Sequence, residues 1–274
     1  MKGRGIGVID GILILLALVV LFPLAMSLMN SLKSNGEIIN NIMSWPKDLL
    51  FSNYAVAFEK TNFLRSFMNT LVVAGVGVVG IVLFASMAGY KLSRTKGRLS
   101  TAFFSLFVFA MLIPFHSIMI TLTKVAKTLG VQGSTLGLGV IYVGLGVPMA
   151  VFLYHGFVKS IPLELDEAAR IDGCGEHRFF FTIVSPLLVP ITSTVVILNT
   201  LWIWNDFLLP LLMLTDSDHY TILLSTNMLF GQYNNNDWSS ILATLILAML
   251  PMILLYVFFQ KYITKGLVDG ALKD

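Results

Sequence analysis

Six long apolar runs constrain this chain more than any other feature of its sequence. They extend over residues 12–29, 71–88, 102–122, 136–158, 187–214 and 241–259. An α-helix needs roughly 20 mostly apolar residues to cross a hydrocarbon core of about 30 Å. Lipid offers the backbone no hydrogen-bond partners, and the alternating pattern of a membrane β-barrel is absent from these runs. The runs therefore predict an all-α polytopic membrane protein with six transmembrane helices.

The composition excludes several other classes of protein. Hydrophobic residues make up 56% of the chain and charged residues 12%, about half the charged share of a soluble domain. Intrinsic disorder needs low hydrophobicity, and a disulfide scaffold needs several cysteines, whereas this chain has only Cys174. The length suits a single transmembrane domain over residues 1–274, without a large soluble catalytic domain in addition.

The distribution of Lys and Arg predicts the orientation in the membrane. Short cytoplasmic loops of membrane proteins carry an excess of positive charge. With the N-terminus in the cytoplasm, twelve of the 18 Lys and Arg fall on the inner side and six on the outer side. Residues 91–98 alone hold four of them and no acid. We therefore expect both termini to be cytoplasmic, and Cys174 to lie in an inner loop where thiols stay reduced.

The first apolar run admits a second interpretation. Its basic start and the residues Ala25-Met26-Ser27 loosely match a secretory signal with its cleavage site. The run is long for the apolar region of such a signal, which favours a membrane anchor.

Two patterns look like ligand sites but lack the necessary context. Gly75, Gly77 and Gly80 match the G-x-G-x-x-G dinucleotide fingerprint, which works only between a strand and a helix. Here they lie inside an apolar run, so we interpret them as sites of close helix packing. The four histidines are scattered, and there is no phosphate-binding loop or nucleophile elbow. No catalytic, cofactor or metal residue is predicted, and the chain is expected not to be an enzyme.

The polar loop over residues 159–186 contains a short predicted helix. Pro162 suits a first helical turn, residues 163–172 are good helix formers, and Gly173 can end the helix in a left-handed conformation. The spacing also allows Asp166 and Arg170 to pair at i, i+4. Four residues share one narrow face of this helix at i, i+3, i+4 and i+7: Leu165, Ala168, Ala169 and Asp172.

This face has two possible functions. Alanines allow a helix to dock closely into a groove of another protein, with Glu164 and Glu167 placed to find polar partners around it. Alternatively, the helix lies on the membrane surface, although such helices usually carry Lys and Arg on their polar face.

The order of residues in the loop resembles a known motif. Glu167-Ala168-Ala169, three residues, Gly173, nine residues, Ile183 and then Ser185-Pro186 are similar to the EAA loop of permease subunits of bacterial ABC importers. Ser185 stands where that motif has leucine. A wider resemblance, to the carbohydrate-importer permeases of the maltose-G type, covers nearly the whole chain. It rests on Phe67-Met68-Asn69-Thr70-Leu71, on Asn205-Asp206-Phe207, and on Lys265-Gly266-Leu267 with Gly270-Ala271.

The resemblance implies a type I ABC importer permease fold in the bacterial cytoplasmic (inner) membrane, with the loop helix acting as a coupling helix. It implies as partners a second homologous permease subunit, two ATPase subunits, an extracytoplasmic solute-binding protein, a sugar substrate and membrane lipid, and no nucleic acid. ATP and Mg²⁺ would belong to the ATPase subunits, and residues 266–273 would also reach the ATPase dimer. The residues implied in coupling are Glu164, Leu165, Glu167, Ala168, Ala169, Asp172 and Gly173.

The fifth apolar run is the least lipid-like. On one helix, Asn199, Trp202 and Asp206 fall at offsets 0, 3 and 7 with Asn205 adjacent, which predicts a polar stripe facing a water-filled pathway. Such a stripe suits a sugar, whose hydroxyls bond to polar groups while its C–H face stacks on a ring. Alternatively, Asp206 caps or braces a kink before Pro210, or pairs with the partner permease.

Three prolines within the runs predict kinks or breaks: Pro114, Pro148 and Pro210. The outer loop over residues 216–238, rich in asparagine, is expected to face the binding protein.

Two further hypotheses remain open at this stage: an importer for a non-sugar solute, and a membrane enzyme that uses Asp206 or His155. The enzyme would need a cluster of titratable groups that the sequence does not reveal.

Overall fold

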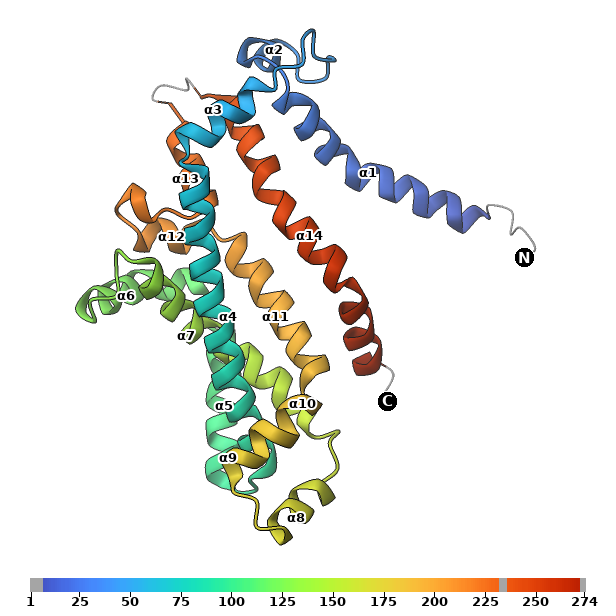
Figure 1. The fold of residues 1–274 in the computed structure, drawn as a ribbon, viewed down its shortest axis with the longest axis vertical. Coiled ribbons are helices and arrows are strands. Elements are labelled where there is room, and N and C mark those ends of the chain that lie inside the picture. The colour runs from blue at the N-terminus through green and yellow to red at the C-terminus, as the bar shows by residue number, and fades with distance from the viewer. Residues whose placement is uncertain (1–6, 232–235, 272–274) are drawn as a thin grey trace. The chain divides into compact units, whose positions relative to one another are not determined.

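The computed structural model describes residues 7–231 and 236–271, and every regular element in those ranges is helical, as predicted (Figure 1). The elements in chain order are α1 (Val8–Ser31), α2 (Asn35–Asn40), α3 (Ser52–Lys60), α4 (Phe63–Arg94), α5 (Arg98–Leu112), α6 (Phe115–Thr128), α7 (Thr135–Val158), α8 (Glu164–Ile171), α9 (Glu176–Phe179), the π-helix η1 (Phe180–Val184), α10 (Ser185–Leu187), α11 (Val189–Trp204), α12 (Leu208–Met213), the 3₁₀-helix η2 (Ser217–His219), α13 (Ile222–Ser225), the 3₁₀-helix η3 (Thr226–Leu229) and α14 (Trp238–Ala271).

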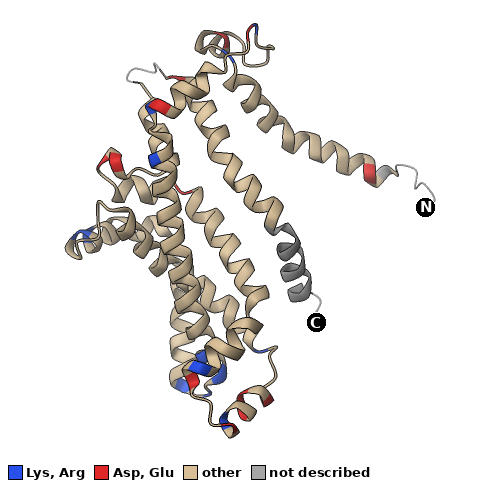
Figure 2. Cartoon of the chain, viewed as in Figure 1, with Lys and Arg blue, Asp and Glu red and all other residues tan. Residues whose placement is uncertain are grey.

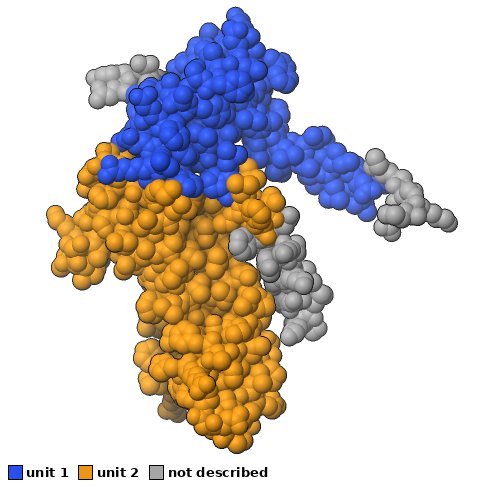
Figure 3. Space-filling view, viewed as in Figure 1, with its two compact units in different colours: residues 1–67, 222–251 blue, residues 68–221, 252–274 orange. Residues whose placement is uncertain are grey.

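The chain divides into two compact units (Figure 3). Unit 1 comprises residues 1–67 and 222–251, and it holds α1–α3, α13, η3 and the start of α14. Unit 2 comprises residues 68–221 and 252–274, and it holds most of α4 together with α5–α12.

Four of the predicted spans are single helices. The helices α1, α4, α7 and α14 are long and apolar enough to cross a membrane, and they contain the predicted runs 12–29, 71–88, 136–158 and 241–259. Of the kink or break expected at Pro148, the break does not occur, because Pro148 lies inside the continuous helix α7.

The other two predicted spans are broken. The run 102–122 divides at Pro114 into α5 and α6, which meet at an angle of 105°. Proline disfavours a helical conformation in the residue before it, and Ile113 has an extended backbone with ψ of 116°. The run 187–214 also divides, because α11 ends at Trp204 and α12 starts at Leu208, and a 77° bend precedes α11. The described residues thus hold four spans, or up to six if each bent pair is one span.

The glycines of α4 bring that helix close to α7 within unit 2. A Cβ atom added at Gly80 would meet the side chain of Val143, and one added at Gly89 would lie 2.6 Å from Cβ of Tyr154. At Gly77 it would lie 2.8 Å from Cδ1 of Ile203. These approaches are closer than real Cβ atoms tolerate, so the interpretation as close packing is confirmed for Gly77 and Gly80, whereas a Cβ atom added at Gly75 would meet nothing within 4 Å.

Most of the surface of helix α1, unlike that of α4, is not packed against other described helices. Its most apolar 18-residue window is 0% buried by the described chain, and the helix carries apolar residues all around its axis. An all-round apolar helix needs an apolar environment that unit 1 does not supply within itself.

Candidate functional site

Helix α8 is a short surface helix whose C-terminal end is fixed by a glycine. Gly173 has a φ of +71°, which glycine adopts without the steric cost that a Cβ atom brings. Its N–H donates to the carbonyl of Arg170 at 3.1 Å, and the N–H of Cys174 donates to the carbonyl of Ala169 at 2.9 Å. This pair of hydrogen bonds is a Schellman motif. The predicted helix with a left-handed glycine at its end is therefore confirmed.

Most of the predicted coupling residues are accessible on the surface of this helix and its C-terminal end. Six of them are exposed: Glu164, Leu165, Glu167, Ala168, Asp172 and Gly173. Ala169 is only 6% exposed and faces the protein, so the predicted shared face is divided. Leu165, Ala168 and Asp172 form the outer stripe, while Ala169 belongs to the inner side.

The inner side of α8 is held by a contact that the sequence did not suggest. Asp166 does not serve as the i, i+4 partner of Arg170; it accepts a hydrogen bond from the hydroxyl of Tyr90 and forms an ion pair with Arg94. The Nε atom of Arg94 lies 3.0 Å from Oδ2 of Asp166, and the two side chains are 11% and 14% exposed. The only signal in the sequence was the cluster of positive charges over residues 91–98, which gave no partner.

Charged residues gather at this end of unit 2 (Figure 2). Lys91, which is one helical step from Tyr90, pairs with Glu176 at 2.7 Å, and both side chains are well exposed. Between α4 and α8 lies a cavity of about 70 Å³ lined by Tyr90, Arg94, Asp166, Ala169, Cys174 and Phe179 among others. It is far smaller than the several hundred Å³ of a typical ligand pocket.

The predicted pathway residues do not form one helical stripe. Helix α11 ends at Trp204, so Asp206 leaves the face that carries Asn199 and Trp202. Asn199 is 7% exposed and donates to the carbonyl of Val195 at 2.8 Å, so its amide group is engaged within its own helix.

Asp206 braces the break between α11 and α12. Its Oδ1 accepts from the N–H of Leu208 at 2.9 Å, and its Oδ2 accepts from the hydroxyl of Tyr142 at 2.8 Å. The alternative in which Asp206 braces a kink before Pro210 is thus confirmed, and the break lies at residues 205–207. Tyr142, which the sequence did not single out, is fully buried in α7.

Trp202 and Asn205 remain accessible beside this break. The indole of Trp202 is 40% exposed and meets the ring of Tyr142 edge to face, with centroids 5.3 Å apart. Asn205 is exposed and donates to the carbonyl of Leu201 at 2.8 Å. One aromatic surface and one amide oxygen are therefore available to a solute.

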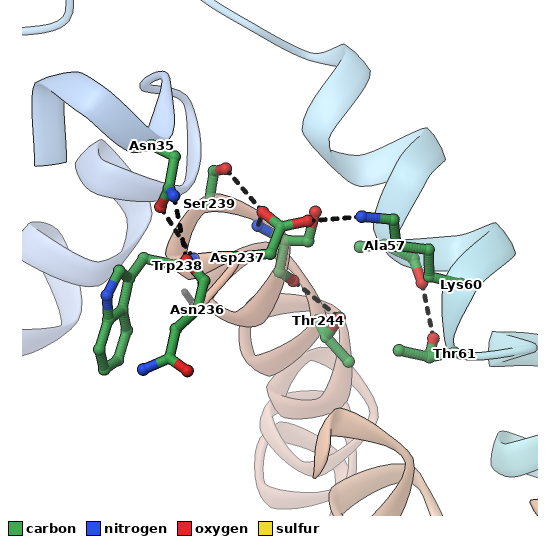
Figure 4. Close-up of polar contacts among 10 residues, drawn as sticks. Asn35, Ala57, Lys60, Thr61, Asn236, Asp237, Trp238, Ser239 and Thr244 are labelled. Atoms are coloured by element: carbon green, nitrogen blue, oxygen red, sulfur yellow. Dashed lines mark hydrogen bonds and ion pairs between the residues drawn. The ribbon is translucent and has the colours of Figure 1, made fainter. Parts of the chain in front are cut away.

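In unit 1, side chains from α2 and α3 fix the segment that enters α14 (Figure 4). The amide of Asn35 donates to the carbonyl of Asn236 at 3.0 Å and accepts from the N–H of Trp238 at 3.0 Å. Lys60 donates to Oδ2 of Asp237 at 2.8 Å. The C-terminal end of the asparagine-rich loop is thus held at three points.

Two carboxyl groups of unit 1 have a perturbed pKa. Burial raises the pKa of Asp237, but hydrogen bonds from Lys60, Ser240 and Ser239 outweigh it and hold that pKa below its ordinary value. Backbone hydrogen bonds from Ser34 and Lys47 lower the pKa of Glu37. Ser34 and Glu37 form the capping box that starts α2.

Among the described residues, no three of His, Cys, Asp and Glu lie together in a group that could hold a metal ion. The predicted contact of residues 266–273 with an ATPase falls on side chains outside the described residues.

Comparisons with known proteins agree with this architecture. The chain is 38% identical to the probable starch degradation products transport system permease protein AmyC of Thermoanaerobacterium thermosulfurigenes, over 95% of this chain and 94% of that protein. It is 37% identical to the melibiose/raffinose/stachyose import permease protein MelC of Bacillus subtilis (strain 168), over 92% of this chain and 91% of that protein.

A solved structure shares the fold. It is a chain of a bacterial ABC transporter involved in the import of the acidic polysaccharide alginate, with a TM-score of 0.81 and 21% sequence identity. The match covers 96% of this chain and 99% of that chain. The predicted importer-permease fold is confirmed.

The family model described as "Binding-protein-dependent transport system inner membrane component" matches residues 81–269. This chain therefore belongs to the family of binding-protein-dependent transport system inner membrane components.

Proposed function

We propose that this chain is the transmembrane permease subunit of an ATP-driven sugar importer, with an oligosaccharide as its cargo. Residues 1–274 act as one permease domain that supplies half of the translocation pathway, and a second homologous permease supplies the other half. Two ATPase subunits bind ATP and Mg²⁺ and hydrolyse the nucleotide, so this chain needs no cofactor of its own. An extracytoplasmic solute-binding protein delivers the sugar.

The observation that carries this proposal is the architecture of α8. Its outer stripe and both glutamates are exposed, and its end is rigidly closed at Gly173. ATP hydrolysis drives transport only if the two states of the ATPase interact differently with the permease. A short rigid helix presented to solvent provides a surface on which such a difference can act.

The charge distribution supports the orientation. If α8 lies in the cytoplasm, both termini are cytoplasmic too, and twelve of the 18 Lys and Arg lie on that side. The tie between α8 and the positive end of α4 fits this assignment, because residues 91–98 would lie on the same side.

The sugar cargo is supported by the relatives. Their names refer to starch degradation products and to melibiose, raffinose and stachyose. Trp202 and Asn205 are the residues through which this chain would contact the sugar, since a ring and an amide match its C–H face and its hydroxyls. Asn199 and Asp206 are proposed to hold the helices that line the pathway without contacting the sugar, because their side chains form hydrogen bonds within the chain.

A reversal of charge on α8 tests the coupling role. Glu167→Lys should leave the protein in the membrane but remove the ATPase subunits from the purified complex. Gly173→Asp should weaken the same association, because a residue with a Cβ atom costs about 1–2 kcal/mol in the left-handed conformation. Glu59→Lys, which makes the same charge change on the exposed surface of α3, is the control and should retain the ATPase. Retention of ATPase and full uptake by Glu167→Lys would refute the proposed role.

The cargo is tested through the cognate binding protein. We expect calorimetric titration to detect oligosaccharide binding by that protein, and labelled sugar to enter proteoliposomes only when ATP is present. Selective binding of a phosphonate, a polyamine or a peptide instead would contradict the sugar assignment while preserving the importer assignment.

A further inference from the structure

Helix α8 is joined to the rest of unit 2 by two kinds of connection. Through the chain, non-helical residues 159–163 and 172–175 flank it on either side. Through space, Asp166 contacts Tyr90 and Arg94 near the end of α4, and we call these contacts the Asp166 tie. Turns absorb a displacement through small changes in φ and ψ, whereas a side-chain tie moves both of its partners together.

The Asp166 tie is shielded from water and has several components. Arg94 and Asp166 are 11% and 14% exposed, so their interaction is screened far less than that of a surface pair. Arg94 also donates from Nη2 to the carbonyl of Ile161 at 2.9 Å, which holds the turn that leads into α8. The guanidinium carbon lies 5.9 Å from the ring centroid of Tyr90. One arginine therefore holds the helix, its preceding turn and the tyrosine.

Tyr90 extends the tie to a third part of unit 2. Its ring lies 6.3 Å from the ring of Phe179 in α9 and 5.7 Å from that of Phe180 in η1. Both phenylalanines are 6% exposed. The segment that leads from α8 towards α11 is thus packed on the same residue that bonds Asp166, and η1 is a π-helix, a form that occurs frequently at functional sites.

A second ion pair lies in the same region, but it is exposed to solvent, whereas the first is largely buried. Lys91 and Glu176 have side chains that are 59% and 77% exposed. Exposed pairs of long side chains contribute little and are weakened by salt. The Lys91–Glu176 pair is therefore a matched control for the buried one.

We infer that Asp166 is a positioning residue that transmits the displacement of α8 directly to α4 through Arg94 and Tyr90. The inference rests on the proposed function, in which an ATPase moves α8 through its outer stripe. Asp166 and Ala169 face inward at i, i+3, whereas Glu164 and Glu167 are exposed. The helix thus has separate faces for receiving a movement and for passing it on.

The test uses the complete importer, with both permeases, the ATPase subunits and the binding protein, reconstituted in proteoliposomes. Asp166→Asn removes the charge and keeps the size of the side chain. We expect the ATPase subunits to co-purify as in the wild type, while sugar uptake per ATP hydrolysed falls roughly tenfold, within the range usual for coupling between sites. Asp166→Glu restores the carboxylate and should recover most of the ratio.

Glu176→Gln should change the same ratio by less than about twofold, because an exposed pair contributes little. If Asp166→Asn does not yield a folded complex, Tyr90→Phe serves instead, since it removes only the hydroxyl that bonds Asp166. An unchanged ratio of uptake to ATP hydrolysis in the folded variant would overturn the inference. So would loss of the ATPase from that variant, because Asp166 would then act in docking. Failure of the wild-type permease to bind any ATPase would instead refute the proposed function itself.

Discussion

The hydroxyl of Tyr142 offers a sharp test of the brace at the break between α11 and α12. Tyr142 and Tyr154 are both fully buried in α7, and each donates one side-chain hydrogen bond. Tyr142 donates to the carboxyl group of Asp206 at 2.8 Å, whereas Tyr154 donates to the hydroxyl of Thr192 at 3.0 Å. Replacing each tyrosine by phenylalanine removes one oxygen atom and keeps the packed ring.

The two substitutions should differ in magnitude. A hydrogen bond to a charged group contributes about 1.5–3 kcal/mol, and one between neutral groups about 0.5–1.5 kcal/mol. For a chain of this size, 1 kcal/mol corresponds to a shift in Tm of about 2–4 °C. With about 2 kcal/mol for the first hydrogen bond and about 1 kcal/mol for the second, Tyr142→Phe should lower Tm by roughly 4–8 °C and Tyr154→Phe by roughly 2–4 °C.

The assay is thermal unfolding of the purified complex in detergent, followed by the loss of monodisperse protein on size exclusion. A shift for Tyr154→Phe as large as that for Tyr142→Phe would refute the reasoning, because the Asp206 bond would then have no special weight. Asp206→Asn provides a second check, and it should lower Tm in the same range while Tyr142 is intact.

Two of the three other predictions use matched pairs of variants, and one uses a single variant at different pH values. Gly80→Val should cost about 1–3 kcal/mol through overpacking against α7, whereas Gly75→Val, with nothing within 4 Å, should leave thermal stability unchanged; equal effects would contradict the packing argument. Because the folded-state pKa of Asp237 lies below its ordinary value of 3.8, its pair with Lys60 adds stability above that pH and loses it as the pH falls through the folded value. Asp237→Asn should thus lower the free energy of unfolding at neutral pH by less than about 1 kcal/mol, which is seen as a slightly lower Tm. In acid the wild type and the variant should have the same Tm. A difference in Tm that stays constant across pH would show that it does not come from the charge of Asp237. Trp202→Ala should reduce sugar uptake without loss of the ATPase, and Trp202→Phe should retain uptake; equal uptake by both variants would remove Trp202 from the pathway.

The features that sequence analysis predicted well are those encoded within one segment. The four continuous spans follow from their length and hydropathy alone. Helix α8 and its left-handed Gly173 follow from local conformational preferences, and the bend at Pro114 follows from the geometry of proline.

The features that it missed depend on partners far away in the chain. Tyr90 is 76 residues from Asp166, and Tyr142 is 64 residues from Asp206. Helical periodicity shows which residues share a face, but it does not show which face the protein covers, so Ala169 was assigned to the outer stripe. The partner that supports the break at residues 205–207 was missed for the same reason, because the buried hydroxyl that bonds Asp206 belongs to α7.

Helix α1 has a consequence for how its mutants should be interpreted. None of its most apolar window is covered by the rest of the described chain, whereas Asn30 and Ser31 at its C-terminal end are buried and Ser31 hydrogen-bonds to Tyr54. Exchanging one aliphatic side chain for another in that window disturbs no neighbour within the described part of unit 1. Any position in that window where such an exchange reduces transport therefore identifies a neighbour beyond the described residues of unit 1, and a mutational scan of the window shows where that neighbour makes contact.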